Sequence, residues 1–351
     1  PDIFGEADLI EEIVRVTSLT KLEGVPLKKI NTGVTKPVLT AFQKRVSRLR
    51  REIVSLGMNE CISYSFIEEY GATQFSSNGS IIRVDNPISI EMGYMRPDLL
   101  PSLLNAASRN QSRGYLDLKL FEVGAIFHGK EPGQQSIVAS GLLTGFSNPR
   151  DPHSERRLLD PFDVKADALS TLEALGATNK YKIYRDVPKI WHPGRAGRVS
   201  LGPKNSLAIF GELHPKIIKS YGLKGTILAF TVFIENIPMK NKKNATRSAL
   251  ETNDLQAVER DFSFVLDERI EASELKIASE SVDTKLIECV TVFDEFSGEK
   301  AHQQLGDGLK SLAVSVRLQP QEKTLTEKEI DEVSVKIIEN VKDKTGGELR
   351  A

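Results

Sequence analysis

A cluster of acidic residues near the start of the chain is the first candidate for chemistry: Asp2, Asp8, Glu11 and Glu12. The last three share one face of a short helix that the apolar spacing predicts over residues 8–19, and the chain before it could fold back toward them. Hard oxygen ligands in this number suit Mg²⁺, which keeps several waters and needs only a few carboxylates. Acidic residues at a helix start also complement the helix dipole without any metal. The spacing alone leaves both interpretations open.

The other chemically capable residues form no recognisable catalytic motif. There is no G-x-S-x-G turn, and residues 306–311 (GDGLKS) predict a hairpin turn rather than a phosphate loop, because the Gly and Lys are not adjacent and a strand follows. Cys61 and Cys289 have no C-x-x-C partner, which excludes a zinc cluster and favours the reducing cytoplasm. The five histidines lack the i, i+4 spacing of a helical metal site: His128, His153, His192, His214 and His302.

Length and composition predict a folded protein of two or three domains, since the 351 residues are 40% hydrophobic and 27% charged. No apolar run approaches the ~18 residues that cross a bilayer, so we expect no membrane span. The start at Pro1, without a methionine or a signal-peptide pattern, suggests a piece of a longer protein.

The net charge of −1 is unevenly distributed along the chain. Residues 1–24 carry 2 basic and 6 acidic side chains, residues 25–256 carry 32 and 21, and residues 257–351 carry 13 and 21. The three segments therefore have net charges of −4, +11 and −8. Attraction to a polyanion such as RNA would come mainly from the middle segment.

The elements that must position these residues begin with a domain over residues 38–236. It mixes helices and strands without strict β-α alternation, which favours an α+β fold on a largely antiparallel sheet. One helix has a capping Asp160, a proline at its first position and a terminal Gly176. Another has apolar residues at helical spacing and precedes a predicted strand over Ile62–Phe66; these apolar residues are Phe42, Val46, Leu49, Ile53 and Leu56. Other predicted strands are 118–127, 181–184, 198–201, 207–210 and 227–234, and 99–110 is a predicted helix.

A second domain is predicted over residues 257–351, after a linker over 237–256 that is rich in Lys and Asn. Its strands and helices follow the order β-α-β-β-α-β of a ferredoxin-like unit. Thr326 and Glu329 form a capping box for the last helix. The alternation in residues 312–318 predicts a strand with one buried and one exposed face.

Several blocks of sequence, taken together and in this order, resemble the bacterial phenylalanyl-tRNA synthetase beta subunit in its C-terminal part. The resemblance extends over essentially the whole chain. The blocks are PDIFGEADLIEEIVRV, NPISIEMGYMRPDLLPSLL with LKLFEVGAIF, WHPGRA with GELHP, RDFSFVLD, VFDEFSG, KSLAVSVRLQ and TLTEKEI.

For the middle domain, the resemblance implies a class II synthetase fold. Class II active sites need an arginine after the strand that corresponds to Leu118–Phe127 and a second arginine in a later glycine-rich element. His128, Gly129 and Lys130 stand at the first position, and no G-x-G-x-x-x-R element precedes the linker. Because adenylation requires positioned cations against a polyphosphate, we expect no catalytic residue in this chain.

For the two ends of the chain, the resemblance implies binding sites. It assigns Asp2, Asp8, Glu11 and Glu12 to Mg²⁺ near the alpha subunit, within residues 1–24 as the remnant of a preceding metal-binding domain. It makes residues 257–351 an anticodon-binding domain, whose solvent face we expect to present Ser263, Ser315 and Arg317 to tRNA. The −8 charge predicts that such binding rests on base stacking and a few hydrogen bonds.

The function expected from the resemblance is a fragment of phenylalanine-tRNA ligase that scaffolds the catalytic alpha subunit and binds phenylalanine tRNA. The holoenzyme, two alpha and two beta subunits, would use ATP and Mg²⁺ in the cytoplasm, without binding DNA or a membrane. The helix and strand over residues 42–66 should keep apolar surface that a partner covers. Two alternatives stay open: a competent class II ligase, if Arg96 or Arg113 clamped a phosphate, and a stand-alone ferredoxin-like interaction module for RNA or protein.

Overall fold

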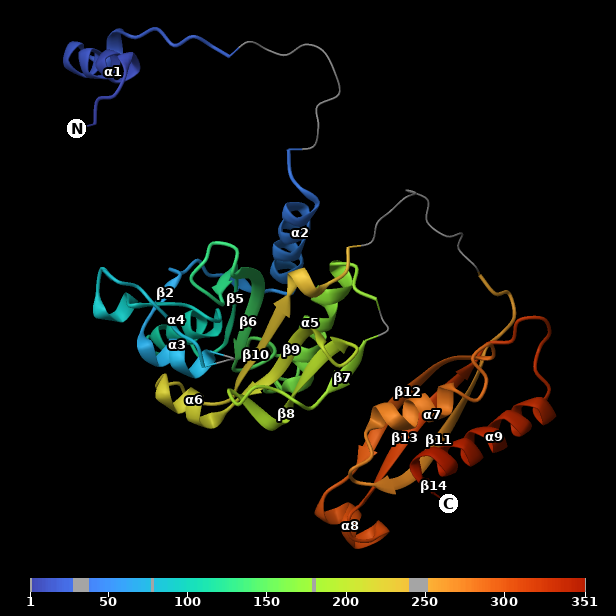
Figure 1. The fold of residues 1–351 in the computed structure, drawn as a ribbon. Coiled ribbons are helices and arrows are strands. Elements are labelled where there is room, and N and C mark those ends of the chain that lie inside the picture. The colour runs from blue at the N-terminus through green and yellow to red at the C-terminus, as the bar shows by residue number, and fades with distance from the viewer. Residues whose placement is uncertain (1, 28–37, 77–78, 179–180, 240–251, 351) are drawn as a thin grey trace. The chain divides into compact units, whose positions relative to one another are not determined.

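The structure, a computed structural model, describes residues 2–27, 38–76, 79–178, 181–239 and 252–350. The chain divides into two compact units, Pro1–Lys242 and Lys243–Ala351 (Figure 1). Each unit has its own hydrophobic core. Among the described residues, no helix combines the length and the apolar character that crossing a membrane requires.

A seven-stranded sheet forms the centre of the first unit. Its strands follow the order β1-β5-β6-β10-β9-β8-β7, and neighbours run antiparallel except that β1 is parallel to β5. The strands are β1 (Asn59–Glu60), β5 (Leu118–Phe127), β6 (Gln135–Thr144), β7 (Lys182–Tyr184), β8 (Trp191–Leu201), β9 (Asn205–Leu213) and β10 (Ile227–Phe233).

Side chains along each strand alternate between the two faces of this sheet, so apolar residues lie on both faces. Helices cover each face. In β10, Phe230 belongs to one core, whereas Ala229 belongs to the other. The first core includes residues of α2 (Ala41–Ser55) and α5 (Pro161–Ala174), and the second includes residues of α3 (Glu69–Phe75), α4 (Leu100–Ser112) and α6 (Pro215–Ser220). The sheet is therefore buried on both faces over much of its area.

Smaller elements complete the first unit. A three-stranded sheet joins β2 (Phe66–Ile67), β4 (Tyr94–Met95) and β3 (Ile82–Arg83). Short 3-10 turns are η1 (Leu19–Lys21), η2 (Ile90–Met92) and η3 (Ile234–Asn236). The amphipathic helix α1 (Glu6–Thr17) contains no buried residue.

The outer edge of β5 is hydrogen-bonded although its neighbour β1 is only two residues long. The carbonyl of Phe121 accepts from the N–H of Cys61 at 2.6 Å. The next outward carbonyls accept from guanidinium groups: Val123 O from Arg50 Nη2 at 3.2 Å, and Ala125 O from Arg96 Nε at 2.8 Å. Side chains thus continue the pairing where the neighbouring strand ends.

The second unit is a four-stranded antiparallel sheet in the order β12-β13-β11-β14. Helices α7 and α9 contribute to the core on one face of the sheet, together with Phe264, Val314 and Val316. The opposite face, the open face, carries the residues that alternate with these along β11 and β13, and none of them belongs to this core. Helix α8 contacts β13 without adding a residue to the core. The elements are β11 (Val258–Asp267), α7 (Ala272–Glu280), β12 (Ile287–Phe296), α8 (Glu299–Leu305), β13 (Leu309–Leu318), α9 (Glu327–Thr345) and β14 (Glu348–Leu349).

The predicted α+β class, with an antiparallel sheet followed by a ferredoxin-like fold, is confirmed. Two local predictions were wrong. Residues 62–64 pair with no strand, because the chain leaves the large sheet after Cys61. The Ser65 carbonyl accepts from the N–H of Arg96, and strand pairing resumes at β2. The predicted hairpin turn at residues 306–311 instead connects helix α8 to β13, because α8 lies between β12 and β13. The predicted linker over 237–256 lies mostly outside the described residues.

Candidate functional site

A cavity of about 880 Å³ lies against the sheet of the first unit. Its walls come from the end of α3, the start of α4, the segment before β8, and strands β9 and β10. Apolar side chains such as Trp191 and Phe233 line most of it, and Asp98, His128 and Thr231 are among its polar groups. A mostly apolar cleft with a few polar groups is the general form of a small-molecule site.

The arginines near this cavity are already engaged. Arg198 donates to both carboxylate oxygens of Asp186, at 2.7 and 2.9 Å. His128 stands where the family resemblance leads us to expect an arginine that clamps a phosphate. Its Nε2 lies 3.1 Å from the Ser136 hydroxyl. Among the described lining residues, these contacts leave no arginine directed at a ligand. Lys189 is the other cation among the described lining residues, so the cavity offers a polyphosphate a lysine but no unengaged arginine.

Arg96 was one of the two alternatives for such a clamp, and its position excludes that role. Its side chain is only 4% exposed, and Nη1 donates to Glu122 at 2.6 Å and to the Ser63 hydroxyl at 3.0 Å. A side chain at Gly124 would have its Cβ only 2.4 Å from Nη2, so this glycine makes room for the guanidinium. Arg113, the other alternative, caps the exposed C-terminus of α4. Arg96 is thus part of a buried structural ion pair.

Asp98 is the most perturbed acid of the cavity. Its carboxylate accepts from the backbone N–H of Leu100 at 2.8 Å and so supports the start of α4. Burial raises its pKa to about 6, against the lowering effect of these backbone hydrogen bonds and of Arg96. A fraction of Asp98 is therefore protonated near neutral pH, although its contacts are those of a helix cap.

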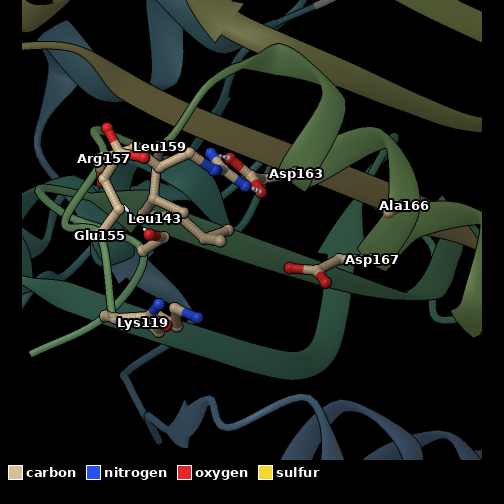
Figure 2. A pocket seen from close by; sticks show the side chains of 10 residues that line it. Lys119, Leu143, Glu155, Arg157, Leu159, Asp163, Ala166 and Asp167 are labelled. Carbon is tan, nitrogen blue, oxygen red and sulfur yellow. Dashed lines mark hydrogen bonds and ion pairs between the residues drawn. The ribbon is translucent and has the colours of Figure 1, made fainter. Parts of the chain in front are cut away.

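A second, more polar pocket of about 460 Å³ lies beside α5, where Lys119 and Glu155 are among the residues that line it (Figure 2). Arg157 binds Asp163 through two hydrogen bonds of 2.7 and 2.5 Å, which lowers the pKa of Asp163. Asp167 points into the pocket from α5, and burial raises its pKa to about 6. The Arg157–Asp163 pair anchors the start of the helix, because Asp163 belongs to its capping box.

The four N-terminal carboxylates do not meet in the structure. Oδ2 of Asp8 accepts from the N–H groups of Phe4 and Gly5, at 2.9 and 2.8 Å, which lowers its pKa. Glu12 pairs with Arg15, while Asp2 and Glu11 are exposed. Within the described part of the chain, no three His, Cys, Asp or Glu side chains are grouped so that they could hold a metal ion. Asp8 acts as a helix cap in this arrangement.

An exposed apolar strip lies on the segment between β1 and β2. Ile62 is 94% exposed and Tyr64 is 72% exposed. Ile88 and Ile90 are also more than 90% exposed. The preceding helix α2 instead buries Leu49 and Ile53 completely, so the predicted exposed surface is confined mainly to the segment and not to the helix.

The open face of the second sheet carries the three residues predicted to bind tRNA. Ser263 shares a hydrogen bond of 2.9 Å with the hydroxyl of Ser311, and Ser315 lines a shallow depression of about 440 Å³. Arg317 lies between two carboxylates, with Nε 2.7 Å from Glu288 and Nη1 3.0 Å from Glu259. These bonds raise the pKa of Arg317 and neutralise its charge locally.

Sequence reasoning missed the other residues of that depression: Glu259, Arg260, Asp261 and Phe293. The alternation of β11 could have placed Glu259 and Asp261 on the open face, since both pair with solvent-facing residues of β13. Phe293 could not be found in this way, because a β-bulge interrupts the alternation of β12 there.

Comparisons with known proteins agree with this domain pair. Residues 26–234 match the family model described as the phenylalanyl tRNA synthetase beta chain CLM domain, and residues 254–350 match the ferredoxin-fold anticodon binding domain. A synthetase-type sheet domain followed by an anticodon-binding fold is the organisation of an aminoacyl-tRNA synthetase chain. The chain belongs to the phenylalanyl-tRNA synthetase beta chain family.

Three relatives, each called phenylalanine–tRNA ligase beta subunit, show the extent of the similarity. The proteins of Cereibacter sphaeroides and Ruegeria pomeroyi are 54% and 52% identical over all of this chain and 43% of their own length. That of Bradyrhizobium diazoefficiens is 40% identical over all of this chain and 44% of its length. The chain thus spans less than half the length of the curated relatives that it matches.

Proposed function

We propose that this chain is the scaffold and tRNA-binding part of a phenylalanine-tRNA ligase. Its first unit would support a catalytic alpha subunit, and its second unit would bind phenylalanine tRNA. ATP would be used by the assembled enzyme, in a cytoplasmic complex of two alpha and two beta subunits. The boundaries proposed for these parts are residues 38–236 for the catalytic-like domain, 237–256 for the linker and 257–351 for the anticodon-binding domain.

The observation that carries the scaffold role is the engagement of Arg96 by Glu122 inside the first unit. Phosphoryl chemistry on ATP depends on cations that face the nucleotide, because the transition state carries spread negative charge. Here the guanidinium is nearly buried and bound by a carboxylate and a carbonyl of the same unit. The catalytic step is therefore assigned to the partner subunit.

The exposed strip at Ile62 and Tyr64 supports the partner role. These large apolar side chains are more than 70% exposed, and covering them with another protein surface would lower the free energy. Partner contacts are enriched in aromatic residues such as Tyr64. We propose that the alpha subunit covers this segment.

We also propose that the N-terminal carboxylates bind Mg²⁺, with Asp8 as one ligand and further ligands brought to it. Asp8 is occupied by two backbone N–H groups through one oxygen, which leaves Oδ1 for a cation. Asp2 and Glu11 are exposed and would have to approach Asp8, or a partner would have to add ligands. The residues as placed do not form a complete Mg²⁺ site.

The test is phenylalanine-dependent exchange of pyrophosphate into ATP, with the purified chain alone and with the alpha subunit of its own organism. We expect no exchange by the chain alone and stable co-purification with the alpha subunit. Exchange by the chain alone would favour a competent class II ligase. Failure to bind the alpha subunit while still binding other partners would favour a stand-alone interaction module.

A further inference from the structure

The 880 Å³ cavity of the first unit adjoins a second hollow of about 560 Å³, the basic pocket. The two share part of their lining, including residues 186–189, Trp191 and Ile217. Most of this shared lining comes from the segment that connects β7 to β8 and from the start of β8. One small ligand can therefore place a different part in each hollow while it contacts the same stretch of chain.

The larger cavity is suited to an apolar group. Its wall along the sheet includes Ile126 of β5, Ile209 of β9 and Phe233 of β10. Ser206 of β9 also lines it, and the Ser206 hydroxyl is buried without a hydrogen-bond partner among the described residues. A buried hydroxyl without a partner costs free energy, which a bound molecule can recover. The cavity thus combines apolar walls with an unsatisfied polar group, as small-molecule sites do.

The basic pocket supplies positive charge beside this cavity. Lys189 and Lys216 line it, and neither ammonium group forms a hydrogen bond or ion pair with another described residue. His214 also lines it, and its Nδ1 accepts from the N–H of Lys216 at 3.2 Å, so the neutral ring carries its proton on Nε2. Lys189 lines the larger cavity as well. An anionic group bound here would lie next to the apolar cavity.

The same lining offers no unengaged carboxylate. Asp98 and Asp186 are the acids among the described residues that line either hollow. Asp186 accepts from Arg198 with both oxygens, and Asp98 accepts from the N–H of Leu100 at the start of α4. An ammonium group would therefore leave water without a carboxylate free to pair with it, which disfavours amines and zwitterions.

We infer that the two hollows form one binding site for a small amphipathic monoanion, an apolar ring or branched chain that carries a single carboxylate. The apolar body lies in the larger cavity against Trp191 and Phe233, and the carboxylate lies between Lys189 and Lys216. Burial of the apolar body supplies most of the affinity, and the two lysines select for the charge. Such binding requires neither the scaffold role nor the tRNA-binding role proposed above.

The experiment uses the full 351-residue chain and two fluorescent probes that differ by one charged group. Anilinonaphthalenesulfonate has an apolar body and one sulfonate, which stands in for the carboxylate, whereas N-phenylnaphthylamine has the same body without the charge. Both fluoresce more strongly in an apolar site. We expect saturable binding of the sulfonate probe, about 3-fold to 30-fold tighter than that of the neutral probe. Absence of saturable binding would overturn the inference.

The variant that tests the charge combines Lys189→Ala with Lys216→Ala. It should lower the affinity for the sulfonate probe to that for the neutral probe and leave the affinity for the neutral probe unchanged. The matched control combines Lys219→Ala with Lys224→Ala, because these two lysines line neither hollow. Equal losses in the variant and the control would show that the sulfonate is not held in the basic pocket. Ser206→Phe, which fills the cavity, should weaken the binding of both probes.

Displacement of the sulfonate probe then tests the class of ligand. Phenylpropionate should displace it. Phenylpropanol, which lacks the charge, and phenylalanine, which adds an ammonium group, should each displace it about 10-fold less effectively. If phenylalanine were as effective as phenylpropionate, the monoanion assignment would be wrong and the hollows would form an amino-acid site.

Discussion

The guanidinium of Arg96 and the carboxylate of Glu122 form a 2.6 Å ion pair in which both side chains are about 95% buried. The pair joins the segment before α4 to the middle of β5, across 26 residues of sequence. Its partners are all protein groups, with Ser63 bridging the two, since its hydroxyl donates to Glu122 at 2.6 Å and accepts from Arg96. What was a candidate phosphate clamp in the sequence is therefore a support of the sheet edge.

Breaking this pair should cost much more than breaking a surface pair. Glu122→Gln or Arg96→Leu leaves one buried charge uncompensated, which we expect to lower the free energy of unfolding by about 3–5 kcal/mol. Urea unfolding of the chain measures this. Asp117→Asn, which breaks the exposed pair with Arg156, is the control and should cost about 0–1 kcal/mol. An equal loss of unfolding free energy in the control would show that the buried pair stabilises the fold no more than the exposed pair does.

Asp98 and Asp167 should make the first unit less stable as pH rises. Their pKa values in the folded state are about 6, above the ordinary 3.8, so the folded state holds extra protons between these values. Stability linked to them is present below pH about 4 and is lost as pH rises through about 6. Asp98→Asn should therefore gain stability relative to wild type, by at most about 3 kcal/mol, above pH 6 and not at pH 4.

The measurement for this prediction is chemical denaturation of wild type and variant between pH 4 and pH 7. Asn keeps a side-chain oxygen that can accept from Leu100, so the start of α4 stays supported. Asp160→Asn, at the cap of α5, is the control because it makes the same substitution at another helix cap. A pH-independent difference between Asp98→Asn and wild type would contradict the linkage.

The surface strip should govern assembly without affecting folding. Ile62→Asp and Tyr64→Asp change exposed residues, so the free energy of unfolding should stay within about 0.5 kcal/mol of wild type. Co-purification with the alpha subunit should be lost, because a charge would be buried at the contact. Ile277→Asp, on the second unit, controls for added charge. Retained association in the two strip variants would place the contact on another surface.

Because two glutamates hold Arg317, replacing it should affect RNA binding differently from replacing an unpaired cation. Arg317→Ala removes one positive charge and also releases Glu259 and Glu288, so the affinity for a stem-loop should fall. Replacing both glutamates with glutamine should raise the affinity and steepen its dependence on salt, because the arginine then faces the phosphates. Titrations at two salt concentrations distinguish these effects. Unchanged affinity in Arg317→Ala would move the contact surface away from this face.

Glu11 offers the cleanest test of the metal proposal, since Asp8 already supports the helix start. Glu11→Gln removes a possible ligand charge without removing a described contact, so it should weaken any Mg²⁺-dependent association with the alpha subunit. Asp8→Asn should weaken α1 whether or not a metal binds. Association that is insensitive to Mg²⁺ in wild type would leave the helix-cap role as the sufficient explanation.

Local sequence signals predicted the elements whose causes are local. The ten residues of β5 and the start of α5 matched closely, because an unbroken apolar run and a capping Asp160 act within a few residues. The capping box of Thr326 and Glu329 likewise lies where it was predicted. The fold class followed from these signals, and so did the order of elements in the second unit except for α8.

Other features depend on partners that are distant in sequence. Strand β6 was missed because its Gly141 has no strand propensity, yet a Cβ there would lie 2.3 Å from the ring of Phe230. The role of Arg96 required knowing that Glu122 would be its neighbour. In the same way, the exposure of Phe293 follows from the register of β12 against β13, which the residues of β12 alone do not specify.

The guanidinium groups along the edge of β5 bear on aggregation. An edge strand with free carbonyls is a template on which a strand from another molecule can add. Arg50 and Arg96 occupy the carbonyls of Val123 and Ala125, and the N–H of Phe127 donates to the Arg96 carbonyl. A foreign strand would have to displace two charged side chains to pair there. This edge is therefore protected against cross-β association.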